Sequence, residues 1–301
     1  MIQSVMITNH AGESIELELR FPEKSGFLIQ DIDGLGPSKA TINSTEMASN
    51  DGAIYNSAHL LSRNILITLA FSIEPSVEEN RLKSYRYFPI KKPVSIRIKT
   101  DKREAETYGY VESNDIDIFS KAEKCLVSLI CPDPYFYSIL KEYTVFANEE
   151  GVFEFPFSNE SLTERLLIMS ILHSDTIKVV KYLGDAPVGV RIYVHALGVV
   201  HNLRIFNLTS RESINIDSDK LILLTGSDIK EGDDIIISTI RGEKYIYLIR
   251  DGIETNILNC VGKDVSWFQL QTGDNVLAYT ADVGIQNLQF RVENNIVYEG
   301  I

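Results

Sequence analysis

The sequence has little of the side-chain chemistry on which metal sites and disulfides depend. Its three cysteines, Cys125, Cys131 and Cys260, match no zinc-binding spacing and cannot all pair. This favours small buried thiols in a reducing compartment. The five histidines are scattered along the chain and form no HExxH motif. We therefore expect no metal ion and no cofactor.

Long apolar runs and an excess of basic residues are missing as well. No stretch of about 18 apolar residues exists, so no membrane span is expected. The first residues alternate between apolar and polar, which indicates a strand rather than a signal peptide. With 29 Lys and Arg against 42 Asp and Glu, the net charge is −13. Such a surface is expected to repel nucleic acid.

The segment Gly34-Leu-Gly36-Pro37 is the nearest approach to a phosphate-binding loop. A dinucleotide fingerprint requires GxGxxG running into a helix, whose N-terminal N–H groups hold the phosphate. Here position 39 is Lys, and the β-branched run SKATINST after Pro37 predicts a strand. The sequence therefore predicts a tight turn that uses the conformational freedom of glycine.

Motifs of nucleophilic and acid–base catalysis are absent or weak. There is no G-x-S-x-G elbow and no cysteine with a convincing histidine partner. Acidic residues do come in close pairs, which could share acid–base work in a glycosidase or bind Ca²⁺. We expect solvated strand ends and turns instead, and no enzyme activity. The pairs are Asp31 and Asp33, Asp115 and Asp117, Asp217 and Asp219, and Asp233 and Asp234, the last being the best glycosidase candidate.

Most of the chain consists of short runs that are typical of strands. Residues 14–21, 94–100 and 124–130 alternate with period two, and Asp251-Gly252 predicts a hairpin turn between two further runs. In the second half, strands are expected at 151–157, 165–172, 177–182, 188–196, 203–208, 220–224, 235–240, 244–250, 254–259, 275–282 and 288–293.

One helix is predicted, between Pro75 and Pro89. Ser76 and Glu79 form a capping box, which satisfies two backbone N–H groups at a helix start. Pro89 ends the helix because proline disfavours a helical residue before it. An apolar stripe that packs on the sheet is expected from Leu82, Tyr85 and Phe88.

A change of character marks the expected domain boundary. Pro132 and Pro134 flank an aspartate and impose an extended path, and the sequence beyond them is more acidic and more β-like. We predict a mostly β protein with two domains, residues 1–140 and 141–301. The first is a β-sandwich or split-barrel-like domain with one helix, and the second is a jelly-roll β-sandwich.

Several segments, taken in order, resemble the distal tail (Dit) family of long-tailed phages with Gram-positive hosts. The second half is similar to the galectin-like C-terminal sandwich of that family, notably at 235–239 and 266–276. The matching segments of the first half are 26–37, 48–52, 63–67, 81–88, 108–112 and 131–136. Their signature turn and boundary residues are Gly34, Leu35, Gly36, Pro37, Asp51, Gly52, Arg63, Pro132 and Pro134.

The resemblance implies a structural protein, made in the cytoplasm of a bacterial host and located at the distal end of the tail in the virion. Such proteins form a homohexameric ring through their N-terminal domains, between the tail tube protein and the tail-tip hub protein. The C-terminal domains project outward and dock receptor-binding proteins, and the central channel lets DNA pass. The alternative is a carbohydrate-binding module that contacts the host cell wall. Trp267 and Phe268 would then stack on sugar, although such a pair is also typical of a sandwich core.

Overall fold

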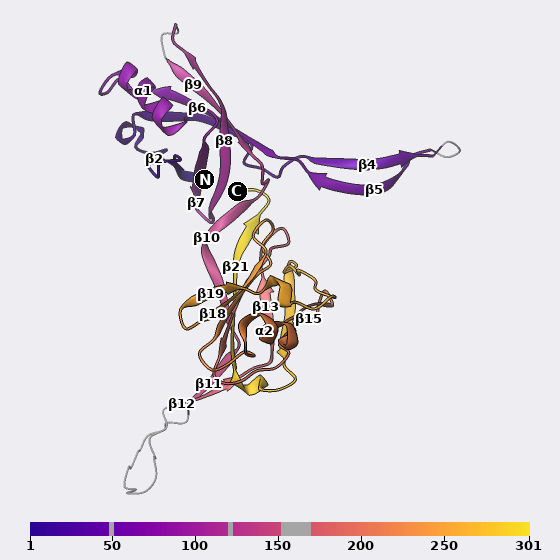
Figure 1. The fold of residues 1–301 in the computed structure, drawn as a ribbon. Helices are drawn as coiled ribbons and strands as arrows, with labels where there is room; N and C mark the ends of the chain where they lie inside the picture. Colours follow the sequence, from indigo (N-terminus) through magenta and orange to yellow (C-terminus); the bar gives the residue numbers. More distant parts are fainter. Residues whose placement is uncertain (48–50, 120–122, 152–169) are drawn as a thin grey trace, which may run out of the picture. The chain divides into compact units, whose positions relative to one another are not determined.

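The computed structural model describes residues 1–47, 51–119, 123–151 and 170–301, and its fold is mostly β (Figure 1). The chain divides into two compact units. Unit 1 comprises Met1–Leu140 and Val297–Ile301, and unit 2 comprises Lys141–Ile296. The last five residues thus belong with the first unit, whereas the sequence assigns 141–301 to one domain.

The sheet of unit 1 is antiparallel and has the strand order β2-β1-β7-β8-β9-β6-β3. Alternate side chains of each strand enter one hydrophobic core, as Ile65 and Ile67 of β6 do. Leu17 and Phe27, from the two ends of the strand order, join the same core, so the sheet curls around it. The strands are β1 (Ile2–Thr8), β2 (Ser14–Glu18), β3 (Phe27–Asp33), β6 (Arg63–Phe71), β7 (Pro93–Thr100), β8 (Glu104–Asp117) and β9 (Lys124–Cys131). Strand β10 (Phe136–Val145) pairs with β8, and its residues from Lys141 on belong to unit 2.

The predicted helix is α1 (Val77–Tyr87), and the serine half of its capping box is confirmed, because the Ser76 hydroxyl accepts the Glu79 N–H at 3.1 Å. The predicted apolar stripe is wrong. Only Phe88, just after the helix, is buried, and the other two stripe residues are exposed. The inward face carries Asn80 and Ser84 instead. Asn80 faces inward because its amide donates to two loop carbonyls before the helix, at 3.0 Å each.

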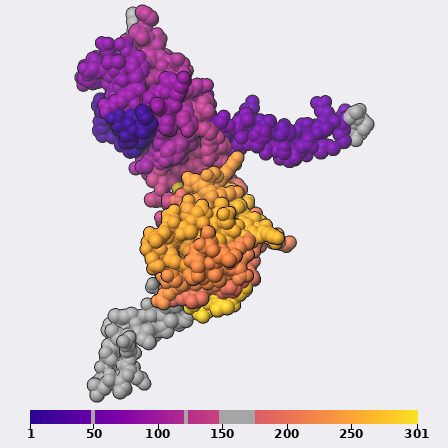
Figure 2. Space-filling model, in the orientation of Figure 1, coloured from indigo at the N-terminus to yellow at the C-terminus, as the bar shows by residue number. Residues whose placement is uncertain are grey.

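Strands β4 (Ala40–Glu46) and β5 (Ala53–Leu60) form a hairpin that we call the arm (Figures 1 and 2). They pair with each other and with no other described strand. Almost every arm side chain is exposed on both faces, including Ile42 at 66% and Tyr55 at 63%. An isolated two-stranded hairpin is marginally stable in water, so contact with a further surface is expected to stabilise the arm.

Unit 2 is a β-sandwich, as the sequence predicts. One sheet contains β19-β18-β17-β14-β21, and the other has the order β13-β20-β15-β16. Tyr279 and Phe290 join the two sheets by stacking with ring centroids 4.4 Å apart. The strands are β13 (Ile177–Tyr182), β14 (Arg191–Ala196), β15 (Arg204–Asn207), β16 (Glu212–Asn215), β17 (Asp234–Ser238), β18 (Tyr245–Arg250), β19 (Ile253–Asn256), β20 (Gly273–Thr280) and β21 (Leu288–Tyr298), with a separate pair β11 (Ala147–Gly151) and β12 (Ser170–Ser174).

The local expectations for unit 2 have mixed outcomes. The hairpin turn at Asp251-Gly252 is confirmed, with φ of 52° and 78°. The strand expected at 220–224 is wrong, because helix α2 (Ser218–Thr225) lies there. Asp217 caps its start and Gly226 ends it in the left-handed conformation, so helix boundaries outweigh the β-like pattern. The strands expected at 151–157 and 165–172 lie largely outside the described residues.

Candidate functional site

A buried guanidinium organises the signature residues of unit 1. Arg63, the first residue of β6, is only 3% exposed. Its Nε donates to the Pro134 carbonyl oxygen at 2.8 Å, and its Nη1 donates to those of Gly34 and Gly36 at 2.5 Å each. Its Nη2 donates to the Glu299 carbonyl oxygen at 2.6 Å. One side chain therefore ties together three segments that are far apart in sequence.

No carboxylate accepts any of these four hydrogen bonds from Arg63. Carbonyl groups and an aromatic ring stabilise its charge instead. All four acceptors are neutral carbonyl groups, and the Phe136 ring lies under the guanidinium with its centroid 4.3 Å from Cζ. Burial lowers the pKa of Arg63, yet a guanidinium stays protonated in proteins. Its planar fork of five donors reaches acceptors in several directions, which a lysine cannot do.

The turn that Arg63 holds depends on one of its two glycines. Gly34 has a φ of 85°, and a Cβ at this position would lie 2.1 Å from the Asn64 carbonyl oxygen. Its N–H donates to the Asp33 carboxylate at 2.7 Å. At Gly36 an added Cβ would meet nothing within 4 Å, and φ is not positive. Strand β4 follows this turn, so no helix N-terminus is present to hold a phosphate.

The last residues of the chain complete the cluster. The Ile301 N–H donates to the Leu35 carbonyl oxygen at 3.1 Å, and Arg103 donates to that of Gly300 at 2.8 Å. A Cβ at Gly300 would lie 3.1 Å from the Leu35 oxygen and 3.2 Å from Pro37. The C-terminal segment therefore packs directly against the turn.

The structure thus brings together six signature residues and separates the others. Asp51 and Gly52 lie at the far end of the arm, because the last residue of β4 pairs with the first of β5 there. Pro132 is exposed. The sequence did not indicate Glu299. This residue contributes only its main-chain carbonyl oxygen, so its side-chain type gives no sign of the contact. The six residues together are Gly34, Leu35, Gly36, Pro37, Arg63 and Pro134.

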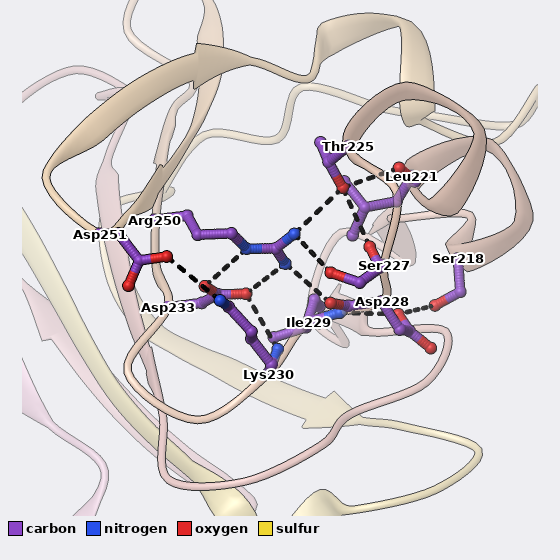
Figure 3. Close-up of polar contacts among 10 residues, drawn as sticks. All are labelled: Ser218, Leu221, Thr225, Ser227, Asp228, Ile229, Lys230, Asp233, Arg250 and Asp251. Carbon is purple, nitrogen blue, oxygen red and sulfur yellow. Dashed lines mark hydrogen bonds and ion pairs between the residues drawn. The ribbon is translucent and has the colours of Figure 1, made fainter.

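A second arginine, which is half-buried, accounts for one of the candidate catalytic carboxylates (Figure 3). Arg250 binds both carboxylate oxygens of Asp233, at 2.9 Å from Nε and 2.6 Å from Nη2. It also donates to the Ser227 hydroxyl and the Asp228 carbonyl oxygen, at 2.6 and 2.7 Å. The Asp233 side chain is 1% exposed. This network fixes the loop between α2 and β17 and leaves Asp233 inaccessible to a substrate.

The glycosidase candidate fails on this geometry. The neighbouring Asp234 has a half-exposed side chain that bonds His195 at 2.7 Å, whereas Asp233 points inward to Arg250. Consecutive carboxylates with opposite orientations cannot flank one glycosidic bond. Asp217, from another acidic pair, is the helix cap described above.

Unit 2 brings together Ser218, Asp228 and His201, but their hydrogen bonds are not those of a catalytic triad. The Ser218 hydroxyl donates to Asp228 at 2.7 Å rather than to the histidine, and Ser218 is fully buried. His201 bonds the other oxygen of Asp228 at 2.6 Å, and this bond raises its pKa. A triad needs the histidine beside the nucleophile to take its proton. The trio therefore serves to hold the start of α2.

The described part of the chain contains neither a group of metal-ligating side chains nor a helix suited to cross a membrane. No group of three or more His, Cys, Asp or Glu side chains there could hold a metal ion. No helix in the same residues is long and apolar enough to cross a membrane. Burial raises the pKa of Cys125 to about 12 and that of Cys131 to about 11, so neither thiol is an activated nucleophile.

The two candidate sugar-binding aromatics occupy different environments. Phe268 is fully buried in unit 2, so it cannot contact a sugar. Trp267 is half-buried, with the Lys244 ammonium 5.8 Å from its ring centroid. The pair does not form an aromatic platform.

Comparison with known proteins gives similarity in fold. No protein-family model and no curated protein sequence matches the chain. Among solved structures, the Dit protein of phage SPP1 matches with a TM-score of 0.66 at 12% identity, over 97% of this chain and 98% of that chain. That protein is described as a paradigm of the hub adsorption apparatus in phages that infect Gram-positive bacteria. A chain of the phage P2 baseplate covers 97% of this chain and 98% of its own length, with a TM-score of 0.49 and 12% identity, too low to establish the fold by itself. The chain therefore has the fold of the SPP1 protein along nearly its whole length.

Proposed function

We propose that this chain is a phage distal tail protein, a structural and non-enzymatic component of the virion. Six copies would form a ring through unit 1, between the tail tube protein and the tail-tip hub protein. Unit 2 would dock receptor-binding proteins, and DNA would pass through the channel. The observation that carries this proposal is the fold shared with SPP1 Dit over 97% of the chain, at a TM-score of 0.66.

The arm supports assembly through unit 1. Neither of its outer strand edges pairs with another strand in the described part of the chain, and both faces are exposed, with the apolar side chains of Ile42, Ile54 and Tyr55 in water. Exposed apolar side chains and free strand edges are stabilised by contact with a partner chain. In a ring, the receiving surface belongs to the next copy, so each contact is heterologous and the rotation closes after six copies.

The test is electron microscopy of the full-length protein, alone and co-expressed with the tail tube and hub proteins from the same genome. We expect six-fold rings, and we expect Ile42→Asp combined with Tyr55→Asp to abolish them. These side chains contact no core, so circular dichroism should show an unchanged fold. The control is Leu223→Asp, which makes the same kind of substitution once, on an 87% exposed residue of unit 2, and should leave the rings intact.

Two outcomes would count against the proposal. One is the absence of rings even with both neighbouring proteins present, together with absence of the chain from purified virions. The other is loss of rings with Leu223→Asp and not with the arm variant, which would move the assembly surface to unit 2.

A further inference from the structure

The outward face of the larger sheet in unit 2 carries an ordered set of side chains. Along β14, Ile192 and Val194 enter the core, so the residues between and after them face outward. Strand β14 pairs with β21 on one side and with β17 on the other. The registers give two rows across the three strands: Arg291, Tyr193 and Ile236, and next to it Gln289, His195 and Asp234.

A cavity of about 480 Å³ opens over these two rows. Val145, Ile236 and Ile249 supply its apolar part, together with the half-buried Tyr193 ring. The polar members of the two rows line it as well, and Val194, Ile235 and Phe290 complete the lining. The cavity is within the range of about 300–1,000 Å³ that small-molecule sites occupy, and a di- or trisaccharide has this size.

The polar groups of the cavity are oriented and accessible. His195 Nδ1 forms a hydrogen bond with the Asp234 carboxylate at 2.7 Å. The His195 side chain is 42% exposed and that of Asp234 is 50% exposed. The Arg291 guanidinium stacks on Tyr193 with 4.5 Å between Cζ and the ring centroid, and on Tyr143 at 5.6 Å. Stacking occupies the flat face of a guanidinium and leaves the N–H groups in its plane for other acceptors.

We propose that this cavity binds a saccharide. A pyranose ring has an apolar face of C–H groups and a rim of hydroxyls, which both donate and accept hydrogen bonds. The apolar face would pack on Tyr193 and Ile236, which form the floor of the cavity. The hydroxyls would form hydrogen bonds with Arg291, Gln289 and the His195–Asp234 pair. This site lies apart from Trp267, and the inference goes beyond the proposed assembly role and does not depend on it.

Other ligand classes fit the same face less well. A peptide that adds to a sheet needs a free strand edge, but β14, β17 and β21 each have a partner strand on both sides. An amphipathic helix needs a continuous apolar groove, whereas here charged and apolar side chains alternate. A small polyhydroxylated ligand uses both kinds of side chain.

The test is an array of hexose, N-acetylhexosamine and uronic acid oligosaccharides probed with the full-length protein, followed by calorimetric titration of the best-bound oligosaccharide. We expect Gln289→Ala and Arg291→Ala to weaken binding about tenfold each, the effect of one lost hydrogen bond of about 1.4 kcal/mol. Both residues are exposed, so folding should be unaffected. The matched control, Trp267→Phe, should bind as the wild type does.

Binding that both cavity variants weaken and the control retains supports the site. Absence of binding across the array overturns the inference, and so does binding that survives both variants or that Trp267→Phe alone removes. Ring formation is measured separately, so a chain that assembles but binds no saccharide refutes only this inference.

Discussion

Replacing Arg63 tests whether one guanidinium holds the signature cluster of unit 1 together. Its four hydrogen bonds come from a charged donor, and such bonds contribute about 1.5–3 kcal/mol each. Their sum overstates the loss, because Arg63→Met also removes the cost of burying a cation. We therefore expect Arg63→Met to lower the free energy of unfolding by about 3 kcal/mol. Arg63→Lys keeps the burial cost and loses the planar fork, so we expect about 2 kcal/mol.

The assay is urea unfolding, followed by both far-ultraviolet circular dichroism and tryptophan fluorescence. Trp267 is the single tryptophan and lies in unit 2, so its fluorescence reports that unit alone. With an m-value of about 1–3 kcal/mol per molar urea, the dichroism midpoint of unit 1 should fall by about 1–3 M for Arg63→Met. The fluorescence midpoint should not move.

A matched arginine variant separates burial from charge. Arg20 is exposed on unit 1, and Arg20→Met should change stability by no more than about 0.5 kcal/mol. If Arg63→Met shifted the unit 1 midpoint no further than this control does, the four hydrogen bonds would not organise the cluster. A shift in the fluorescence midpoint instead would show that the two units do not unfold separately.

The remaining predictions concern the turn and the pH dependence of unit 1. Gly34→Ala should destabilise unit 1 by about 2 kcal/mol or more in the same assay, because Gly34 has a positive φ and an added Cβ would meet the Asn64 carbonyl oxygen. Gly36→Ala should change stability by less than about 0.5 kcal/mol. Equal effects of the two changes would contradict the assignment of the turn to Gly34. Hydrogen bonds from Arg86 and Asn9 lower the pKa of Glu13 to about 2, so its contribution is present above about pH 4.5 and is lost as the pH falls toward 2. Glu13→Gln should therefore lower the urea midpoint at neutral pH and match the wild type near pH 2; a difference independent of pH would refute this.

Sequence patterns predict those parts of the fold that local chemistry decides. The Ser76 cap of α1 and the Asp251-Gly252 turn were found because their partners lie within a few residues. The inward face of α1 was not predicted, because hydrogen bonds to loop carbonyls turn Asn80 inward and no helical pattern reveals these bonds. Likewise, apolar composition suggested a strand where the caps of α2 determine a helix.

The candidate sites were predictable only in part, for a related reason. Arg63 was identified by resemblance, but its acceptors are carbonyl groups up to 236 positions away, and every residue type has a carbonyl. The saccharide cavity depends on the registers of β14 with β17 and β21, which set residues from three separate segments side by side. Trp267 and Phe268 were conspicuous because they are adjacent in sequence, yet one of them is buried.

The return of Val297–Ile301 to unit 1 has a consequence for biosynthesis. Domains usually fold in order as the chain leaves the ribosome, the N-terminal one first. Here the fourth acceptor of Arg63, at Glu299, is made after all of unit 2. Unit 1 therefore reaches its final hydrogen bonding only after unit 2 has been synthesised, and until then the Arg63 guanidinium has three of its four carbonyl acceptors.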